Sequence, residues 1–518
     1  MKKVLAAAAT LAMAAGPTPA QAAAKDSKGA SHFLQCDGRT GHVGAGESFM
    51  RLLLVTATAG ISEAGMASDD AGKRLKGADG AAACAQAIAS EGDNYRRVQL
   101  ALARAIHLGE DKNWAAAVEA ARAVPGVIAP DSTDWALAKS AKATARLLEA
   151  TLLAQQGRHA EAEEALVAAG EAGEMEVTNL QRAVRLMGFD RTMTPRKKAV
   201  LDRAFRVMPS EGLVIASHFA EAGDYASAVA TIDALTQVFD LFAKEPGKTA
   251  SFESQAGLFL AMGGDVAGAR ARLAVARAEA AKDAADGSAQ KYAVAAAKAD
   301  EAIAATEVAL AIADKRDADA RRLFAARERW ALIPQGVAAT LAGRVAAVTP
   351  AAERTGLLAK GDAGLWAETR EARAKLLAEE AAEKMQWALT NRLTVDRRYT
   401  ELSSQVWSAT KKPKLLLKGK PGDRIEILSI MTRAYGAQAG EALMLHAALI
   451  ARTRGKQGFV VVPVRDRVDL MGVRFASASE TGVPAGALVS ADEVIASLGP
   501  RIPQPQKNPG IYRPTTRN

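Results

Sequence analysis

Apolar residues recur at helical spacing over most of the chain. The clearest stretch is IASHFAEAGDYASAVATIDAL, residues 215–235, in which apolar residues lie three or four positions apart on both sides of Gly223. Such spacing places the apolar side chains on one face of each of two helices, and a glycine permits a left-handed turn between them. The stretch therefore predicts a helical hairpin with small residues where its two helices cross.

The same pattern recurs at four other places. An alanine lies five positions after Gly223, and bulky apolar residues lie four positions before it and nine after it. Gly157 and Gly264 have equivalent surroundings, and two looser copies complete the set. Alanine at a crossing lets the two helices of a hairpin approach closely. The equivalent alanines are Ala117, Ala162, Ala228, Ala269 and Ala320.

These residues resemble tetratricopeptide repeats, which are helix–turn–helix units of about 34 residues that stack side by side. The resemblance covers residues 94–330 and implies a stack of helical hairpins. The equivalent alanines are 45, 66, 41 and 51 residues apart, so the predicted stack is irregular. The longest interval leaves room for a degenerate hairpin at residues 178–207. A generic alanine-rich helical bundle is the alternative.

The residue pattern changes near the C-terminal end. KLLLK, RIEILSIMTR and GFVVVPVRDRV have strand composition, and EALMLHAALIARTRG has the period of a helix. Ser490 and Glu493 form a capping box that predicts a further short helix. We therefore expect a mainly α protein, with an irregular solenoid of TPR-like hairpins over residues 94–400. The solenoid is followed by a small basic α+β domain at residues 401–500 and by a disordered, Pro-rich basic tail at residues 501–518.

The first 22 residues have the form of a secretory signal peptide. Lys2 and Lys3 precede an apolar run at residues 4–15, and Ala20-Gln21-Ala22 is a cleavage site of the A-x-A type. The apolar run is shorter than the ~20 residues that a membrane-spanning helix needs, and no later segment is apolar enough to span a bilayer. We therefore expect a protein without a transmembrane segment that is exported to the periplasm and cleaved after about Ala22.

The chain contains two cysteines, Cys36 and Cys84. In an oxidising compartment such a pair favours a disulfide. A nucleophilic or a lipid-bearing cysteine is the alternative. A lipid-bearing cysteine would directly follow the apolar run, and Cys36 lies well beyond that run. We predict a disulfide that ties residues 23–93 into a helical cap over the first repeat.

Composition and charge add one candidate surface. Hydrophobic residues make up 49% of the chain but aromatic residues only 5%, which suits closely packed alanine-rich helices. The net charge is +9, and residues 390–518 alone hold 20 basic and 10 acidic residues. A cluster in this segment is a candidate contact for an anionic envelope surface, and a solvated, solubilising stretch is the alternative. The cluster is Lys411, Lys412, Lys414, Lys418, Lys420 and Arg424.

Motifs that carry chemistry are missing from the sequence. It contains no G-x-S-x-G, no H-E-x-x-H, no phosphate-binding loop and no Gly-rich dinucleotide turn. The triplet from His159 to Glu161 matches the opening of a zinc deaminase, but no P-C-x-x-C follows. Two cysteines and six scattered histidines do not favour a structural zinc site. We therefore predict no catalytic, metal or cofactor residues, and the expected compartment argues against nucleic acid as a partner.

Two hypotheses for function follow. The first is a periplasmic adaptor or scaffold that binds a protein or peptide partner of the cell envelope. The alternative is a cell-envelope enzyme, related to the cell wall, with its site in the α+β domain; the low aromatic content argues against a carbohydrate cleft. The resemblance implies that outward residues of the first helices line the partner groove. These residues are Gln99, Gln155, Ser217, Glu221 and Met262.

Overall fold

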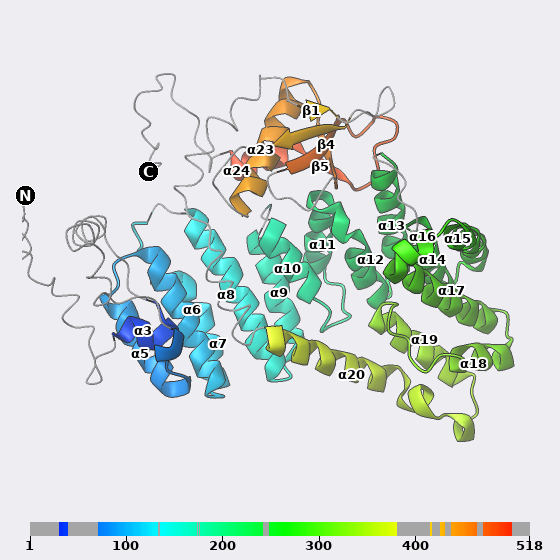
Figure 1. The fold of residues 1–518 in the computed structure, drawn as a ribbon, viewed down its shortest axis with the longest axis horizontal. Coiled ribbons are helices and arrows are strands. Elements are labelled where there is room, and N and C mark those ends of the chain that lie inside the picture. The colour runs from blue at the N-terminus through cyan, green and yellow to red at the C-terminus, as the bar shows by residue number, and fades with distance from the viewer. Residues whose placement is uncertain are drawn as a thin grey trace, which may run out of the picture. The chain divides into compact units, whose positions relative to one another are not determined.

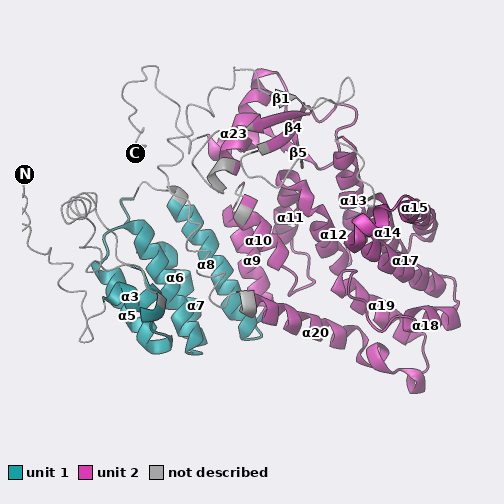
Figure 2. Cartoon of the chain, viewed as in Figure 1, with its two compact units in different colours: residues 1–158, 378–395 teal, residues 159–377, 396–518 magenta. Residues whose placement is uncertain are grey.

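The protein is mainly helical, with one small antiparallel sheet near its C-terminal end (Figure 1). It divides into two compact units, shown in Figure 2 and described separately below. Unit 1 holds residues 1–158 and 378–395, and unit 2 holds residues 159–377 and 396–518. The computed structural model describes residues 31–39, 71–132, 135–173, 175, 177–241, 248–380, 415–416, 425–429, 437–463 and 470–499.

Several predictions concern residues outside these ranges. They include the signal peptide at residues 1–22, the tail at residues 501–518, and the basic cluster from Lys411 to Arg424. The division between the units falls between Arg158 and His159, inside the segment predicted as one stack. None of the helices in the described ranges is long and apolar enough to cross a bilayer.

Five helix–turn–helix joints share one backbone geometry, at the places that the sequence pattern predicts. One residue in each joint has a positive φ, and the next N–H bonds to the carbonyl oxygen five residues earlier. This arrangement closes the last turn of the first helix, and the alanine five positions later is fully buried in every copy. The residues with positive φ are Lys112 (57°), Gly157 (72°), Gly223 (81°), Gly264 (90°) and Lys315 (56°).

Unit 1 is a set of helices in which α6 packs between α5 and α7 (Figure 1). Asp93 begins α6, because its side chain accepts a hydrogen bond from the N–H of Arg96 at 2.8 Å. The elements are α3 (His32–Asp37), η2 (Ala71–Lys73), α5 (Gly77–Ser90), α6 (Asn94–Glu110), α7 (Trp114–Ala123), η3 (Val124–Val127) and α8 (Trp135–Gln155).

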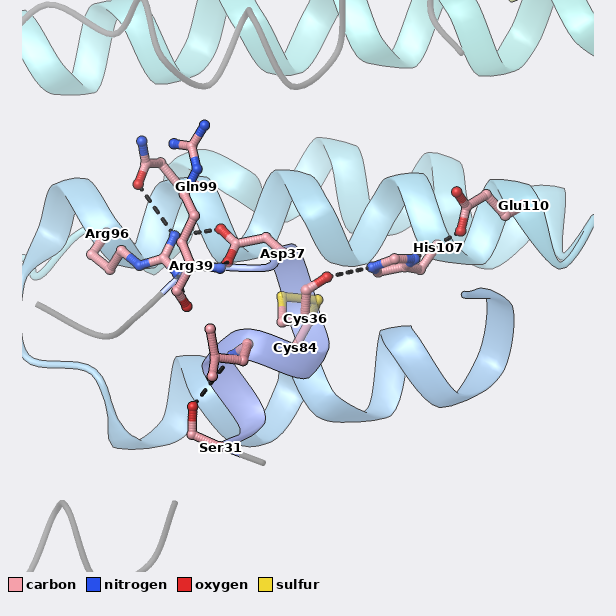
Figure 3. The surroundings of a disulfide bond; sticks show 10 residues. Ser31, Cys36, Asp37, Arg39, Cys84, Arg96, Gln99, His107 and Glu110 are labelled. Atoms are coloured by element: carbon pink, nitrogen blue, oxygen red, sulfur yellow. Dashed lines mark hydrogen bonds and ion pairs between the residues drawn. A yellow bond between two sulfur atoms is a disulfide. The ribbon is translucent and has the colours of Figure 1, made fainter. Parts of the chain in front are cut away.

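Cys36 on α3 and Cys84 on α5 form a disulfide, as predicted (Figure 3). Both cysteines are fully buried and pack with Ala87, Leu100 and Ala103 of α5 and α6. A helix of six residues, such as α3, is too short to be stable alone in water. The disulfide and this apolar cluster therefore hold α3 against the longer helices.

Polar contacts surround the disulfide on both sides. Arg96 donates to Asp37 Oδ1 at 2.7 Å, and both side chains are buried. His107 lies fully buried, with Nδ1 2.8 Å from Glu110 Oε2 and Nε2 2.6 Å from the carbonyl oxygen of Cys36 (Figure 3). A Cβ at Gly80 would lie 2.8 Å from the His107 ring, so only glycine allows α5 to approach α6 this closely.

Unit 2 contains further helical pairs: α12 packs along α13, α14 along α15, and α17 along α18. The degenerate hairpin expected at residues 178–207 corresponds to α10 and α11, and Thr194 caps α11 just before Pro195, which suits the first position of a helix. Helix α20 bends at Gly361. The helices are α9 (His159–Gly173), α10 (Val177–Leu186), α11 (Pro195–Val207), η4 (Pro209–Glu211), α12 (Gly212–Glu221), α13 (Tyr225–Asp240), α14 (Lys248–Gly263), α15 (Val266–Ala285), α16 (Ser288–Lys291), α17 (Ala293–Ala313), α18 (Asp317–Ala325), α19 (Gln335–Ala347), η5 (Ala351–Glu353) and α20 (Gly356–Glu380).

The C-terminal part of unit 2 has the predicted α+β character. The sheet has the order β1-β2-β4-β3-β5 with antiparallel neighbours, and α23 and α24 pack on it. Ser490 caps α24, as the capping box indicates. Strands β4 and β5 were not expected from the sequence. The elements are β1 (Leu415–Leu416), β2 (Glu426–Ser429), α23 (Ala437–Thr453), β3 (Gly458–Val462), β4 (Leu470–Ala476), β5 (Leu488–Ser490) and α24 (Ala491–Leu498).

Loss of the disulfide should destabilise unit 1. The two cysteines are 48 residues apart, and closing a loop of that length stabilises a fold by up to about 4 kcal/mol. We expect a Cys36→Ala/Cys84→Ala variant to show faster hydrogen exchange in α5 and α6, measured by mass spectrometry. Helices α14 and α17 of unit 2 serve as the internal control. Unchanged exchange in α5 and α6 would contradict this account.

Candidate functional site

The residues predicted to line a partner groove do not form one open surface. Gln99, Glu221 and Met262 are only 6%, 7% and 2% exposed, so the prediction that they face outward is wrong. Other parts of the same unit cover them, since Gln99 accepts a hydrogen bond from buried Arg96, and α19 and α20 contact the Glu221 side chain. Gln155 and Ser217 are partly exposed.

Glu221 instead joins three helices of unit 2. Its carboxylate at the end of α12 accepts the N–H of Gly336, at the start of α19, at 3.0 Å. The same carboxylate pairs with Arg373 of α20 at 3.0 Å. A Cβ at Gly336 would lie 2.8 Å from the Glu221 side chain, so the close approach requires glycine. A residue expected to meet a partner therefore binds a helix of its own chain.

Long side chains hold α20 in place. The guanidinium groups of Arg191 and Arg373 lie 4.3 Å and 5.4 Å from the centre of the Trp366 ring. Arg191 also pairs with Asp362 at 2.8 Å, and Arg373 donates to the carbonyl oxygen of Gly188. Cation–π and ion-pair contacts of this kind are strongest where water is partly excluded. They anchor α20 to the connection between α10 and α11.

That connection is fixed by a buried carboxylate. Glu163 of α9 accepts the N–H groups of Gly188 and Phe189 at 2.8 and 2.9 Å. The ammonium of Lys197, a residue only 2% exposed, lies 2.6 Å from Glu163 Oε1 and donates to the carbonyl oxygen of Asp190 at 2.8 Å. Both charges are thus satisfied inside the protein, and they set the position of the connection that α20 contacts.

His159 opens the triplet that matches a zinc deaminase motif. Its ring stacks on Phe189 at 5.7 Å with an angle of 2° between the planes. Burial, together with the positive charge of Arg370, lowers the pKa of His159. No group of three or more His, Cys, Asp or Glu side chains in the described ranges is arranged to hold a metal ion. His159 is therefore a packing residue in this structure.

His218 is a second buried histidine in the same region. Its Nε2 donates to the carbonyl oxygen of Val184 at 2.7 Å. Burial and the neighbouring Lys197 lower the pKa of His218, and the carboxylates of Glu221 and Glu163 oppose this effect. The imidazole is thus held neutral between the two carboxylate centres that position α20.

A cavity of about 880 Å³ lies elsewhere in unit 2, between the helices and the sheet. Residues of α12, α13, α14, α17, β3 and β4 line it, and the lining contains no Asp or Glu. Among its described residues the cavity therefore lacks the facing carboxylates that the enzyme hypothesis requires. Its chemistry is that of a binding site with apolar walls and basic groups at the rim.

Comparison with known proteins finds no match to this chain among family models, curated proteins or solved structures.

Removing the buried ammonium should destabilise unit 2 strongly. We expect Lys197→Met to cost about 3–5 kcal/mol, because it leaves the Glu163 carboxylate buried without its counter-charge. Lys198→Met is the matched control, since the neighbouring lysine is half-exposed and should cost less than about 1 kcal/mol. Urea unfolding followed by hydrogen exchange in α9 to α11 measures both effects, and equal costs would refute the assignment.

Acid should also weaken unit 2. The pKa values of His159 and His218 are lowered in the folded chain, so the unfolded chain takes up protons first as the pH falls. Stability is therefore full above pH ~6.5, the ordinary pKa of histidine, and declines below it toward the folded pKa. Urea midpoints between about pH 5 and 8 should show this slope. His218→Asn should flatten it, because the variant lacks this titrating group.

Proposed function

We propose that this protein is an exported adaptor of the cell envelope that binds a protein or peptide partner through its helical hairpins. The observation that carries the proposal is the way in which unit 2 binds α20. Within unit 2, no described helix packs along the backbone of α20 as α12 packs along α13. Instead, side-chain contacts hold α20: Asp362, Trp366 and Arg373 of α20 contact groups of the other helices and of the connection after α10. A bound peptide is held by its anchor residues in the same way.

The anchors of α20 have the chemistry of an interface. Trp and Arg carry a large share of binding energy where proteins meet, especially in water-poor surroundings. Asp362, Trp366 and Arg373 are four and seven residues apart, so a straight helix presents all three on one face. A partner helix with an acidic, an aromatic and a basic residue at this spacing would fit the same receptor groups, which are Arg191, the carbonyl of Gly188 and the carboxylate of Glu221.

The remaining surface of α20 supports this view. Leu376 is 55% exposed although it lies between anchored residues and the buried Leu377. The helix therefore presents one aliphatic side chain to the protein and the next to water. Helix α20 thus occupies a receptor face that suits peptide binding, and it leaves part of its own apolar surface uncovered.

Export and repeat character are supported by separate features. The buried disulfide fits an oxidising compartment, in line with the signal-like first 22 residues. Five joints with the same turn geometry and the same buried alanine fit the resemblance to tetratricopeptide repeats. In proteins of that kind, stacked hairpins provide extended binding surfaces.

A peptide supplied in trans tests the proposal. We expect a Trp366→Ala/Arg373→Ala variant to bind a fluorescent peptide of residues 356–380 saturably. The unaltered chain should bind it at least about tenfold more weakly, because the tethered α20 competes at high effective concentration. Fluorescence anisotropy measures both affinities.

Two controls make the result specific. A peptide of equal length that carries both alanine substitutions should not bind the variant. Adding Arg191→Ala to the receptor should weaken binding of the native peptide, since this removes one side of the Trp366 contact. Failure of the variant to bind the native peptide, or equal binding of both peptides, would refute the proposed receptor face.

A further inference from the structure

The cavity in unit 2 has apolar walls on three sides. Met208 and Leu213 come from the joint between α11 and α12, Phe239 and Phe252 from α13 and α14, and Val461 from β3. The two phenylalanine rings lie 5.8 Å apart at an angle of 41°, so they form a continuous aromatic wall. With about 880 Å³, the cavity has the size of sites that enclose most of a small organic ligand.

The rim of this cavity is basic. Lys291 and Lys298 line it at the end of α16 and on the first turns of α17, with Tyr292 between them. Lys291 lies 5.0 Å from the centre of the Tyr292 ring. Within the described part of the chain, no carboxylate lines the cavity. Among the described residues of the site, therefore, no acidic group neutralises these two cations.

An exposed aliphatic side chain stands at the same rim. Val294 is 69% exposed and lies next to both lysines in the lining. Its aliphatic side chain extends the apolar lining of the cavity to the rim, beside the two lysines. An apolar chamber with two lysines at its rim is complementary to a ligand that has an apolar part and an anionic end.

We propose that this cavity binds a single-chain amphiphile. Its hydrocarbon tail occupies the chamber between Phe239, Phe252 and Val461, and its anionic head, a carboxylate or a phosphate, pairs with Lys291 and Lys298. Among the described lining residues, the side-chain hydroxyls are those of Ser210, Ser251 and Tyr292. An extended peptide would bury a row of backbone amides that these groups cannot satisfy, whereas a hydrocarbon tail needs no such partners. The proposal does not depend on the adaptor function.

Titration calorimetry with a chain-length series tests the tail. Sodium salts of the C8, C10 and C12 fatty acids, each below its micelle concentration, should bind with affinities that rise about fourfold per methylene, or 0.8 kcal/mol. Dodecyl phosphate and dodecanoate distinguish a phosphate from a carboxylate head. Dodecyltrimethylammonium should bind at least about tenfold more weakly, since the rim repels it. Affinity that is independent of chain length, or equal for the cation, overturns the proposal.

Variants place the ligand in this cavity. Lys291→Glu/Lys298→Glu should reduce dodecanoate affinity at least about tenfold, while Lys142→Glu, at an exposed position on α8, should leave it unchanged. Ala293→Trp adds bulk at an exposed position of the lining and should also weaken binding without disturbing the fold. Binding that survives both changes at the rim overturns the assignment, as does an apolar hexapeptide that displaces dodecanoate at equal concentration.

Discussion

Unit 2 depends on buried carboxylates that bind the backbone of connections between helices. Glu163 takes two successive N–H groups of the connection after α10, and Glu301 of α17 takes those of Leu332 and Ile333 at 2.6 and 2.9 Å. A carboxylate buried without such donors costs several kcal/mol. A helix with such a carboxylate can therefore bury it at low cost only when the connection supplies its N–H groups. The same residues therefore determine both the packing of these helices and the position of the connections.

This constraint reaches the proposed receptor face directly. The connection that Glu163 holds presents the carbonyl oxygen of Gly188 to Arg373 of α20. Glu221 completes the contact from α12, and it also binds the first turn of α19. The groups that contact α20 are thus also held by partners outside α20, and such pre-organisation lowers the entropy lost on binding. Under the proposed function a partner helix replaces α20, and such a helix would also have to fill the space of Leu377, which is buried.

Local features were predictable from the sequence, and non-local ones were not. The five joints depend on residues within about ten positions of each other, so the glycine turns and the equivalent alanines could be recognised directly, whereas the left-handed Lys112 and Lys315 were not predicted. The burial of Glu163 could not be predicted from the sequence. Glu161 and Glu164 lie in the same run and have the same side chain, but both are exposed because no other part of the unit covers them. The outward prediction for Glu221 and Met262 was wrong for the same reason. Helix α19 returns more than seventy residues later in sequence and contacts both.

The proposed cavity site and the proposed receptor face for α20 are linked by the segment between α18 and α19. Lys298 at the cavity rim and Glu301 lie on adjacent turns of α17, and Glu301 holds the segment that leads into α19. The first turn of α19 is bound by Glu221, the partner of Arg373. Contiguity alone does not couple two sites, since coupling needs an element with two arrangements that each site favours differently. If a partner helix replaces α20 as proposed, α20 is that element, because its release would break the pair between Glu221 and Arg373 while Glu221 still binds the first turn of α19.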